Sequence, residues 1–107
     1  MEFRDLQAAA IRVQEKYREF NAKQGHGPWG VAEYMQGFVG DVGDLAKLIM
    51  AKNGLRTKSD VDAKLAHELA DCLWSIFAIA RELEIDLEQV FMQTMTELEE
   101  KIDRGTK

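Results

Sequence analysis

The sequence predicts an all-α fold, a four-helix antiparallel bundle that is completed by oligomerisation. Apolar residues recur at the spacing of an amphipathic helix along the whole chain, and no segment shows the alternation of a strand. The single proline, Pro28, leaves long stretches free to form helices. The 107 residues fit one domain, expected to span residues 1–107 with a frayed tail from residue 103.

Two helices are expected in the first half of the chain. The first covers residues 3–22, and the segment "KQGHGPWG" that follows ends it with glycines and Pro28. The second begins near Pro28 and runs to about Lys52, where Asn53 and Gly54 form a common helix terminator. Three glycines fall inside this second helix, and they either let a bulky group approach or permit close helix packing: Gly37, Gly40 and Gly43.

Two further helices are expected in the second half. Ser59, with Asp62 three residues later, resembles a capping box and starts a third helix that ends near Glu84. Asp86 is placed to cap the fourth helix, with Gln89 at its third position. Because only a few residues join the second and third helices, these two should form an antiparallel hairpin in which middle faces middle.

The composition indicates a cytoplasmic protein with neither a nucleic-acid nor a membrane partner. The formal charge of −5 argues against binding to polyanions, which requires a basic face. The single cysteine, Cys72, suits a reducing compartment. The charged start "MEFRDLQAAAIRVQEK" does not resemble a signal peptide, and no apolar run reaches the roughly 20 residues of a membrane span.

Two pairs of acids stand in the middle of the hairpin. Asp41 and Asp44 share one face of the second helix, and Glu68 and Asp71 have the same spacing on the third. Four converging carboxylates repel one another, and a hard cation such as Mg²⁺, or Mn²⁺ in its place, would offset that repulsion. The alternative is that the acids lie on a solvated face or pair with basic residues of the chain: Lys47, Lys64 or Arg81. The matched depth of the two pairs favours the metal.

A di-iron carboxylate site is not indicated. Such bundles need a Glu-x-x-His pair on each of two helices, whereas His67 directly precedes Glu68 and is expected to point elsewhere. The acids, in the contexts "DVGDL" and "ELADCLW", resemble the paired-acid signature of the MazG-like, all-α nucleoside triphosphate pyrophosphohydrolases. The start of the fourth helix, "IDLEQVF", is also similar, so the resemblance covers roughly residues 29–95.

The resemblance implies cleavage of a (d)NTP between its α and β phosphates, giving a nucleoside monophosphate and pyrophosphate, in the service of nucleotide-pool house-cleaning. By position, Asp41, Asp44, Glu68 and Asp71 would hold Mg²⁺ and form the catalytic set, and one of them, such as Asp41, would accept the proton of the attacking water. The family also implies a homodimer or homotetramer.

The sequence departs from the family in two places. The first acid pair is Asp/Asp where the family usually has Glu/Glu, so a cation must sit closer to the second helix or be bridged by water. Many relatives carry a lysine and an asparagine on the last helix, where this chain offers Thr94 and Leu98. These departures leave open a second function, a catalytically silent helical oligomerisation or regulatory module.

Other residues are weaker candidates. Trp29 is a candidate for stacking on a nucleobase, although an aromatic residue at a helix start commonly serves packing. Lys64, one turn before Glu68, is a candidate for contacting a phosphate. Trp74 and Phe77 are expected in the core or at a subunit contact. They belong to a broad apolar arc on the third helix that one four-helix unit cannot cover, which independently predicts a homo-oligomer.

Overall fold

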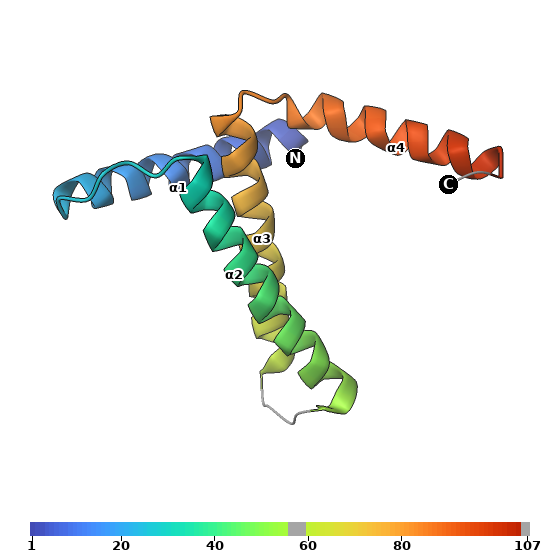
Figure 1. The fold of residues 1–107 in the computed structure, drawn as a ribbon, viewed down its shortest axis with the longest axis horizontal. Helices are drawn as coiled ribbons and strands as arrows, with labels where there is room; N and C mark the ends of the chain where they lie inside the picture. The colour runs from blue at the N-terminus through green and yellow to red at the C-terminus, as the bar shows by residue number, and fades with distance from the viewer. Residues whose placement is uncertain (56–59, 106–107) are drawn as a thin grey trace.

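The structure is a computed structural model that describes residues 1–55 and 60–105, and it is helical throughout (Figure 1). Within this part of the chain there is no strand, so the predicted all-α class is confirmed. The elements in chain order are α1 (Phe3–Lys23), α2 (Val31–Met50), the short π-helical segment η1 (Ala51–Leu55), α3 (Val61–Glu82) and α4 (Leu87–Asp103). None of the described helices has the length and apolar character required to cross a membrane.

The helix boundaries agree with the sequence to within a few residues. The second helix begins at Val31, three residues after Pro28, and its end is extended by η1, in which Gly54 has a positive φ of 86°. Glycine adopts this conformation without a steric penalty, which explains its place at the end of the helix. The predicted cap at Asp86 is confirmed, because its Oδ1 accepts a hydrogen bond from the Gln89 amide at 3.2 Å. The proposed cap at Ser59 lies outside the described residues.

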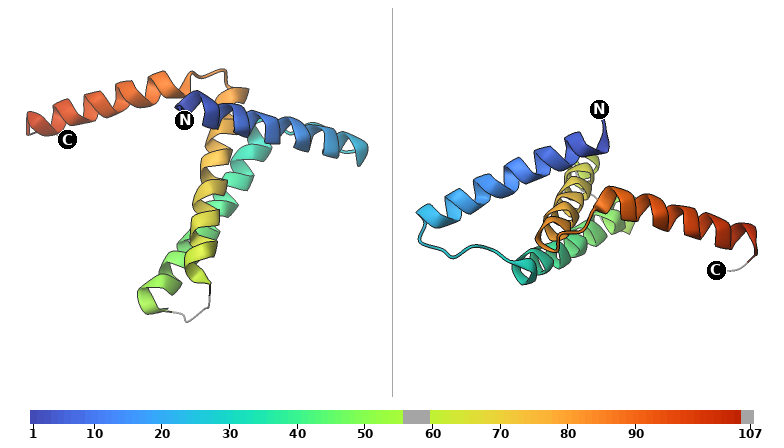
Figure 2. Two further views of the ribbon diagram at one scale, coloured as in Figure 1. Left: turned by 180° about the vertical axis from the view of Figure 1, so that it is seen from behind. Right: turned by 90° about the horizontal axis from the view of Figure 1, so that it is seen from above.

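Helices α2 and α3 form the predicted hairpin. They lie side by side and antiparallel over their whole length, with their connection at the end remote from α1 (Figures 1 and 2). Apolar burial is concentrated on α3, near the start of α2 and at the first residue of η1. The buried apolar residues here are Tyr34, Ala51, Val61, Cys72, Phe77, Ala78 and Ala80. The hairpin is therefore the most extensively packed part of the molecule.

Helix α1 crosses the open end of the hairpin and packs on α3 (Figure 2). The Trp74 indole donates a hydrogen bond to the carbonyl oxygen of Ala10 at 3.1 Å. Gln14, only 1% exposed, donates to Glu82 Oε2 at 3.1 Å and accepts from Arg81 at 3.4 Å. Since a buried amide requires partners, this polar contact fixes where α1 docks.

Helix α4 extends away from the hairpin, so a single chain does not close a four-helix bundle (Figure 1). The radius of gyration is 17.1 Å, whereas a compact domain of this length has about 13 Å. The apolar stripe of α4 is exposed; it consists of Val90, Phe91, Met95, Leu98 and Ile102. Completion of the bundle by a second copy therefore stays a prediction.

Replacing Gln14 with alanine should destabilise the protein by about 2 kcal/mol, because Arg81 and Glu82 each lose a partly buried hydrogen-bond partner. The matched control is Gln36→Ala, at an exposed position of α2, which should change stability by less than about 0.5 kcal/mol. Urea denaturation of both variants measures the difference. Equal losses in the two variants would contradict a docking role for Gln14.

Candidate metal centre and adjoining cleft

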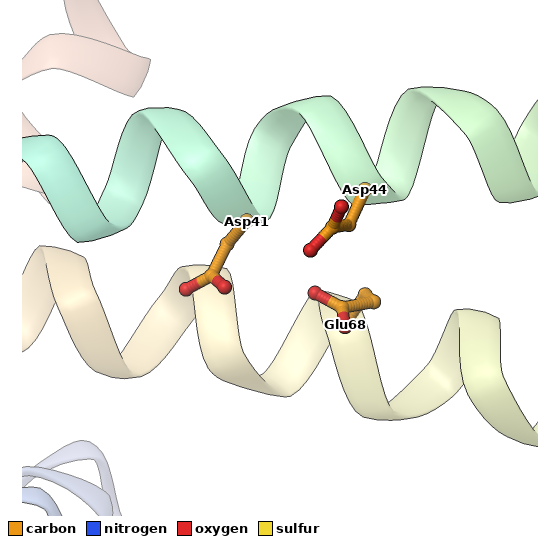
Figure 3. Close-up of side chains that lie close together, drawn as sticks. All are labelled: Asp41, Asp44 and Glu68. Carbon is orange, nitrogen blue, oxygen red and sulfur yellow. The ribbon is translucent and has the colours of Figure 1, made fainter.

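Three of the four predicted acids meet in the middle of the hairpin. Oxygen atoms of Asp41 and Asp44 on α2 and of Glu68 on α3 all lie within 4.8 Å of one another (Figure 3). Asp41 and Glu68 are half-buried and Asp44 is exposed. The sequence anticipated this, because equal arms of an antiparallel hairpin place the middle of α2 opposite the middle of α3.

The fourth acid, Asp71, is not part of this three-oxygen group. It lies one turn further along α3, where its Oδ2 is 3.2 Å from His67 Nε2. His67 was expected to point elsewhere, but it faces Asp71 and lines the neighbouring cleft. The signal that could have identified it is its four-residue spacing from Asp71, which puts two helical side chains in contact.

Among the described residues, no lysine or arginine forms an ion pair with the three clustered acids. Lys64 faces Asp60 at 3.8 Å, and Arg81 faces Glu15 at 2.6 Å. Lys47 is exposed and forms no ion pair with the clustered acids in the described part of the chain. The ion-pair alternative left open by the sequence therefore has no support from the side chains that were candidates for it.

Burial and mutual repulsion raise the pKa of two of these acids. The pKa of Asp41 is raised first by burial and then by the charges of Asp71 and Asp44, with His67 acting in the opposite direction. The pKa of Glu68 is raised by burial and by the same neighbouring carboxylates together with Asp41. In the folded protein, this cluster therefore holds negative charge less readily than isolated carboxyl groups do.

The donor set fits a hard divalent cation. All three ligands are carboxylate oxygens, the donors that Mg²⁺ and Mn²⁺ prefer. Glu68 Oε2 is buried and has no hydrogen-bond partner among the described residues, so it has a lone pair to offer. Ligands on opposite sides of Mg²⁺ are about 4.1 Å apart, so an oxygen spacing of up to 4.8 Å requires a small side-chain movement or a bridging water.

A cleft of about 650 Å³ opens beside the acids. Its walls are one face each of α1, α2 and α3, together with the loop before α2. Asp41, His67 and Asp71 contribute to it where α2 and α3 carry the acids. Its other lining residues are mostly apolar or aromatic: Val13, Tyr17, Phe20, Asn21, Trp29, Tyr34, Gly37, Ala70, Trp74 and Ser75.

Four aromatic rings form a continuous band along this cleft. Edge-to-face contacts join Trp29 to Tyr34 at 5.5 Å, Tyr34 to Trp74 at 5.9 Å and Trp74 to Tyr17 at 5.7 Å, measured between ring centroids. Trp29, the predicted stacking residue, thus lies in the cleft wall. Trp74 also lies there as well as packing on α1, whereas Phe77 is in the core, as expected.

The glycines of α2 separate into two kinds. A Cβ at Gly37 would lie 3.9 Å from the Trp29 ring, an ordinary contact, and Gly37 itself lines the cleft. A Cβ at Gly40 or Gly43 would meet nothing within 4 Å. Close packing of helices within the chain therefore does not explain these glycines. The other explanation, space for a bound group, is still open at Gly37.

Comparison with known proteins agrees with this geometry. The family model of the MazG nucleotide pyrophosphohydrolase domain matches residues 30–104. The chain belongs to the MazG family. It is also similar to the Gene 37 protein of Mycobacterium phage L5, with 30% identity over 80 residues that cover 71% of this chain and 69% of the phage protein. No solved structure matches the chain.

The MazG match includes the acid cluster but begins after α1, so one wall of the cleft lies outside the matched region. The other predicted substrate residue, Lys64, is not among the cleft-lining residues. On α4, Thr94 and Leu98 lie on the helix that extends away from the hairpin. Within one chain, the cleft therefore draws its lining from α1, α2, α3 and the loop before α2.

Added Mg²⁺ should stabilise the protein, because the cation neutralises carboxylates that repel one another in the folded state. At about ten times Kd the expected gain is about 1.4 kcal/mol. Asp41→Asn should be at least as stable as the parent in EDTA and should gain much less from Mg²⁺. Thermal melts in EDTA and in millimolar Mg²⁺ measure both effects, with Asp103→Asn as the control for loss of one surface charge. A parent protein that does not respond to Mg²⁺ or Mn²⁺ would contradict the metal centre.

The raised pKa values also predict a pH dependence. The folded state binds the protons of Asp41 and Glu68 more tightly than the unfolded chain does, so protonation of these groups stabilises the fold. This stabilisation is fully present below about pH 4, and it is lost as the pH rises through the raised pKa values of the folded protein. In EDTA, the melting temperature of Asp41→Asn relative to the parent should therefore increase between about pH 4 and pH 7. A difference that stays constant over this range would argue against repulsion at Asp41.

Proposed function

We propose that the protein is an Mg²⁺-dependent pyrophosphohydrolase that cleaves a (d)NTP between its α and β phosphates, removing surplus or non-canonical nucleotides from the cytoplasmic pool. The observation that carries the proposal is the group of three carboxylates beside an aromatic cleft. Glu68 Oε2 is buried there without a hydrogen-bond partner in the part of the chain that the structure describes. Membership of the MazG family supports the same reaction class.

The carboxylates of Asp41, Asp44 and Glu68 would hold the cation, and Asp71 would join them through a side-chain movement or a shared water. When bound, the cation neutralises phosphate oxygens and lowers the pKa of a coordinated water. Because the two α2 acids are aspartates, their short side chains hold such an ion close to α2.

The reaction consumes one water molecule and cleaves one anhydride bond. The water oxygen bonds to one of the two phosphorus atoms, and the bond from that phosphorus to the bridging oxygen breaks. Asp41 is the candidate acceptor for the water proton, because its carboxylate belongs to the acid cluster and also lines the cleft. The products are a nucleoside monophosphate and pyrophosphate.

The cleft would hold the nucleoside part of the substrate. Trp29 offers a ring on which a nucleobase can stack, at the aromatic part of the cleft. Lys64, 55% exposed and one turn before Glu68, keeps its proposed role as a contact for the outer phosphates. Such a contact requires its side chain to leave Asp60, which costs little for an exposed ion pair.

We further propose that the working form is a homodimer or homotetramer. Two regions of apolar surface lack a partner: the α4 stripe, with Phe91 53% exposed, and the outer face of α3, with Leu69 55% and Leu73 46% exposed. Exposed apolar surface on this scale is characteristic of subunit contacts. Light scattering should give a mass of two or four chains at micromolar concentration, and a stable monomer would contradict this assembly.

The catalytic proposal is tested by pyrophosphate release from a panel of NTPs and dNTPs with Mg²⁺ or Mn²⁺. Glu68→Gln and Asp71→Asn remove one charge with little change in shape, and each should lower kcat at least about 100-fold by loss of charge stabilisation. Glu99→Gln, on α4, is the matched control and should keep parental turnover. Parental turnover in Glu68→Gln would contradict the mechanism, whereas a parent inactive on every nucleotide would favour the silent helical module.

A further inference from the structure

The α1 wall of the cleft carries a side-chain amide, that of Asn21, with no hydrogen-bond partner among the described residues. Asn21 is half-buried and lines the cleft between Phe20 and the aromatic band. Its backbone carbonyl accepts hydrogen bonds from the Gln24 and His26 amides, but its side chain makes none within residues 1–55 and 60–105. A carboxamide in an aromatic cleft has both a donor and an acceptor to offer to a ligand.

A second polar group opens onto the same cleft from α3. Ser75 is 3% exposed and lines the cleft, and its hydroxyl makes no hydrogen bond in the described part of the chain. Its oxygen is not among the buried atoms without a partner in the described residues, so it stays accessible from the cleft, where water or a ligand can satisfy it. Ser75 lies one helical turn beyond Asp71, on the side away from Glu68.

The order of groups along the cleft matches the order of groups in a nucleotide. The acids lie near the middle of the hairpin, and Ser75 and Gly37 come one turn further along α3 and α2. Trp74 adjoins Ser75, and the remaining rings and Asn21 belong to α1, to the loop before α2 and to the start of α2. Phosphates held at the acids would therefore leave the sugar beside Ser75 and the base among the rings. At Gly37 no side chain obstructs this path.

We propose that two residues of this cleft determine nucleoside specificity: Asn21 hydrogen-bonds the edge of the base, and Ser75 contacts the sugar. This inference rests on the proposed function for the position of the phosphates at the acids. It assigns recognition of the base and the sugar to two further residues. Stacking on the aromatic band provides affinity for any base, because every base has a π face. The Asn21 amide provides selectivity among the bases, because it can pair with an adjacent donor and acceptor on a base edge.

The two tryptophans of the chain allow a test that does not depend on turnover. Trp29 and Trp74 are the only tryptophans and both line the cleft, so intrinsic fluorescence reports its occupancy. We expect the four nucleoside monophosphates to quench this fluorescence with different Kd values, and ribose 5-phosphate, which has no base, to leave it unchanged. Quenching by ribose 5-phosphate equal to that by the nucleotides would overturn the subsite.

Variants separate the two assigned contacts. Asn21→Ala should weaken binding about twofold to tenfold for the preferred base and reduce the differences among bases, since a neutral hydrogen bond contributes about 0.5–1.5 kcal/mol. Asn21→Asp, which cannot donate, should disfavour binding through a base edge that presents only acceptors, such as the N7/O6 edge of guanine. Ser75→Ala should weaken all four nucleotides equally while its melting temperature stays at or above that of the parent, because no hydrogen bond is lost within the protein.

Asn53→Ala is the matched control, since it removes the only other asparagine from an exposed position in η1. It should leave every Kd unchanged. An unaltered base ranking in Asn21→Ala would overturn the role of Asn21, as would an oligomeric mass that changes in this variant, because the cleft wall would then be a contact between copies. Pyrophosphate release is measured separately: binding with these preferences but no hydrolysis would overturn the proposed reaction and leave the subsite standing.

Discussion

Electrostatic repulsion across the α2–α3 hairpin is the constraint on which the rest of the molecule depends. Folding brings oxygens of the half-buried Asp41 and Glu68 and of the exposed Asp44 within 4.8 Å of one another, and no lysine or arginine of residues 1–55 and 60–105 forms an ion pair with them. Apolar contacts of the hairpin must therefore hold two helices together against their own charges. The same repulsion that weakens the folded chain favours any divalent cation that enters, so stability and binding are coupled at this point.

Much of the hairpin could be predicted because its determinants are local. The helical spacing of apolar residues predicted the all-α class, and Asp86 predicted a helix cap that the structure confirms. The short connection predicted an antiparallel hairpin. Equal arms then brought Asp41 and Asp44 opposite Glu68. Each step needs only the geometry of one helix or of one pair of helices.

The remainder depends on contacts between distant segments, which periodicity does not encode. An apolar stripe shows that α1 buries a face but not that Gln14 docks it across the end of α3. Nor does a stripe show that α4 leaves the hairpin. His67 directly precedes Glu68 on the helix and was therefore expected to point away from the acids, but its contact is with Asp71, one turn away. Asn21 carries no motif at all and becomes notable only when the cleft is seen.

The cleft is assembled from two parts of the chain that are under different structural constraints. Its acid end belongs to the hairpin, where any change of charge alters the repulsion among Asp41, Asp44 and Glu68. Its α1 wall begins before the region shared with the MazG family and is docked through Gln14, on the turns of α1 that precede Asn21. Substitutions on the exposed part of α1 can therefore reshape what the cleft accepts without disturbing the hairpin. In such an arrangement, ligand preference can drift among related proteins while the chemistry stays fixed.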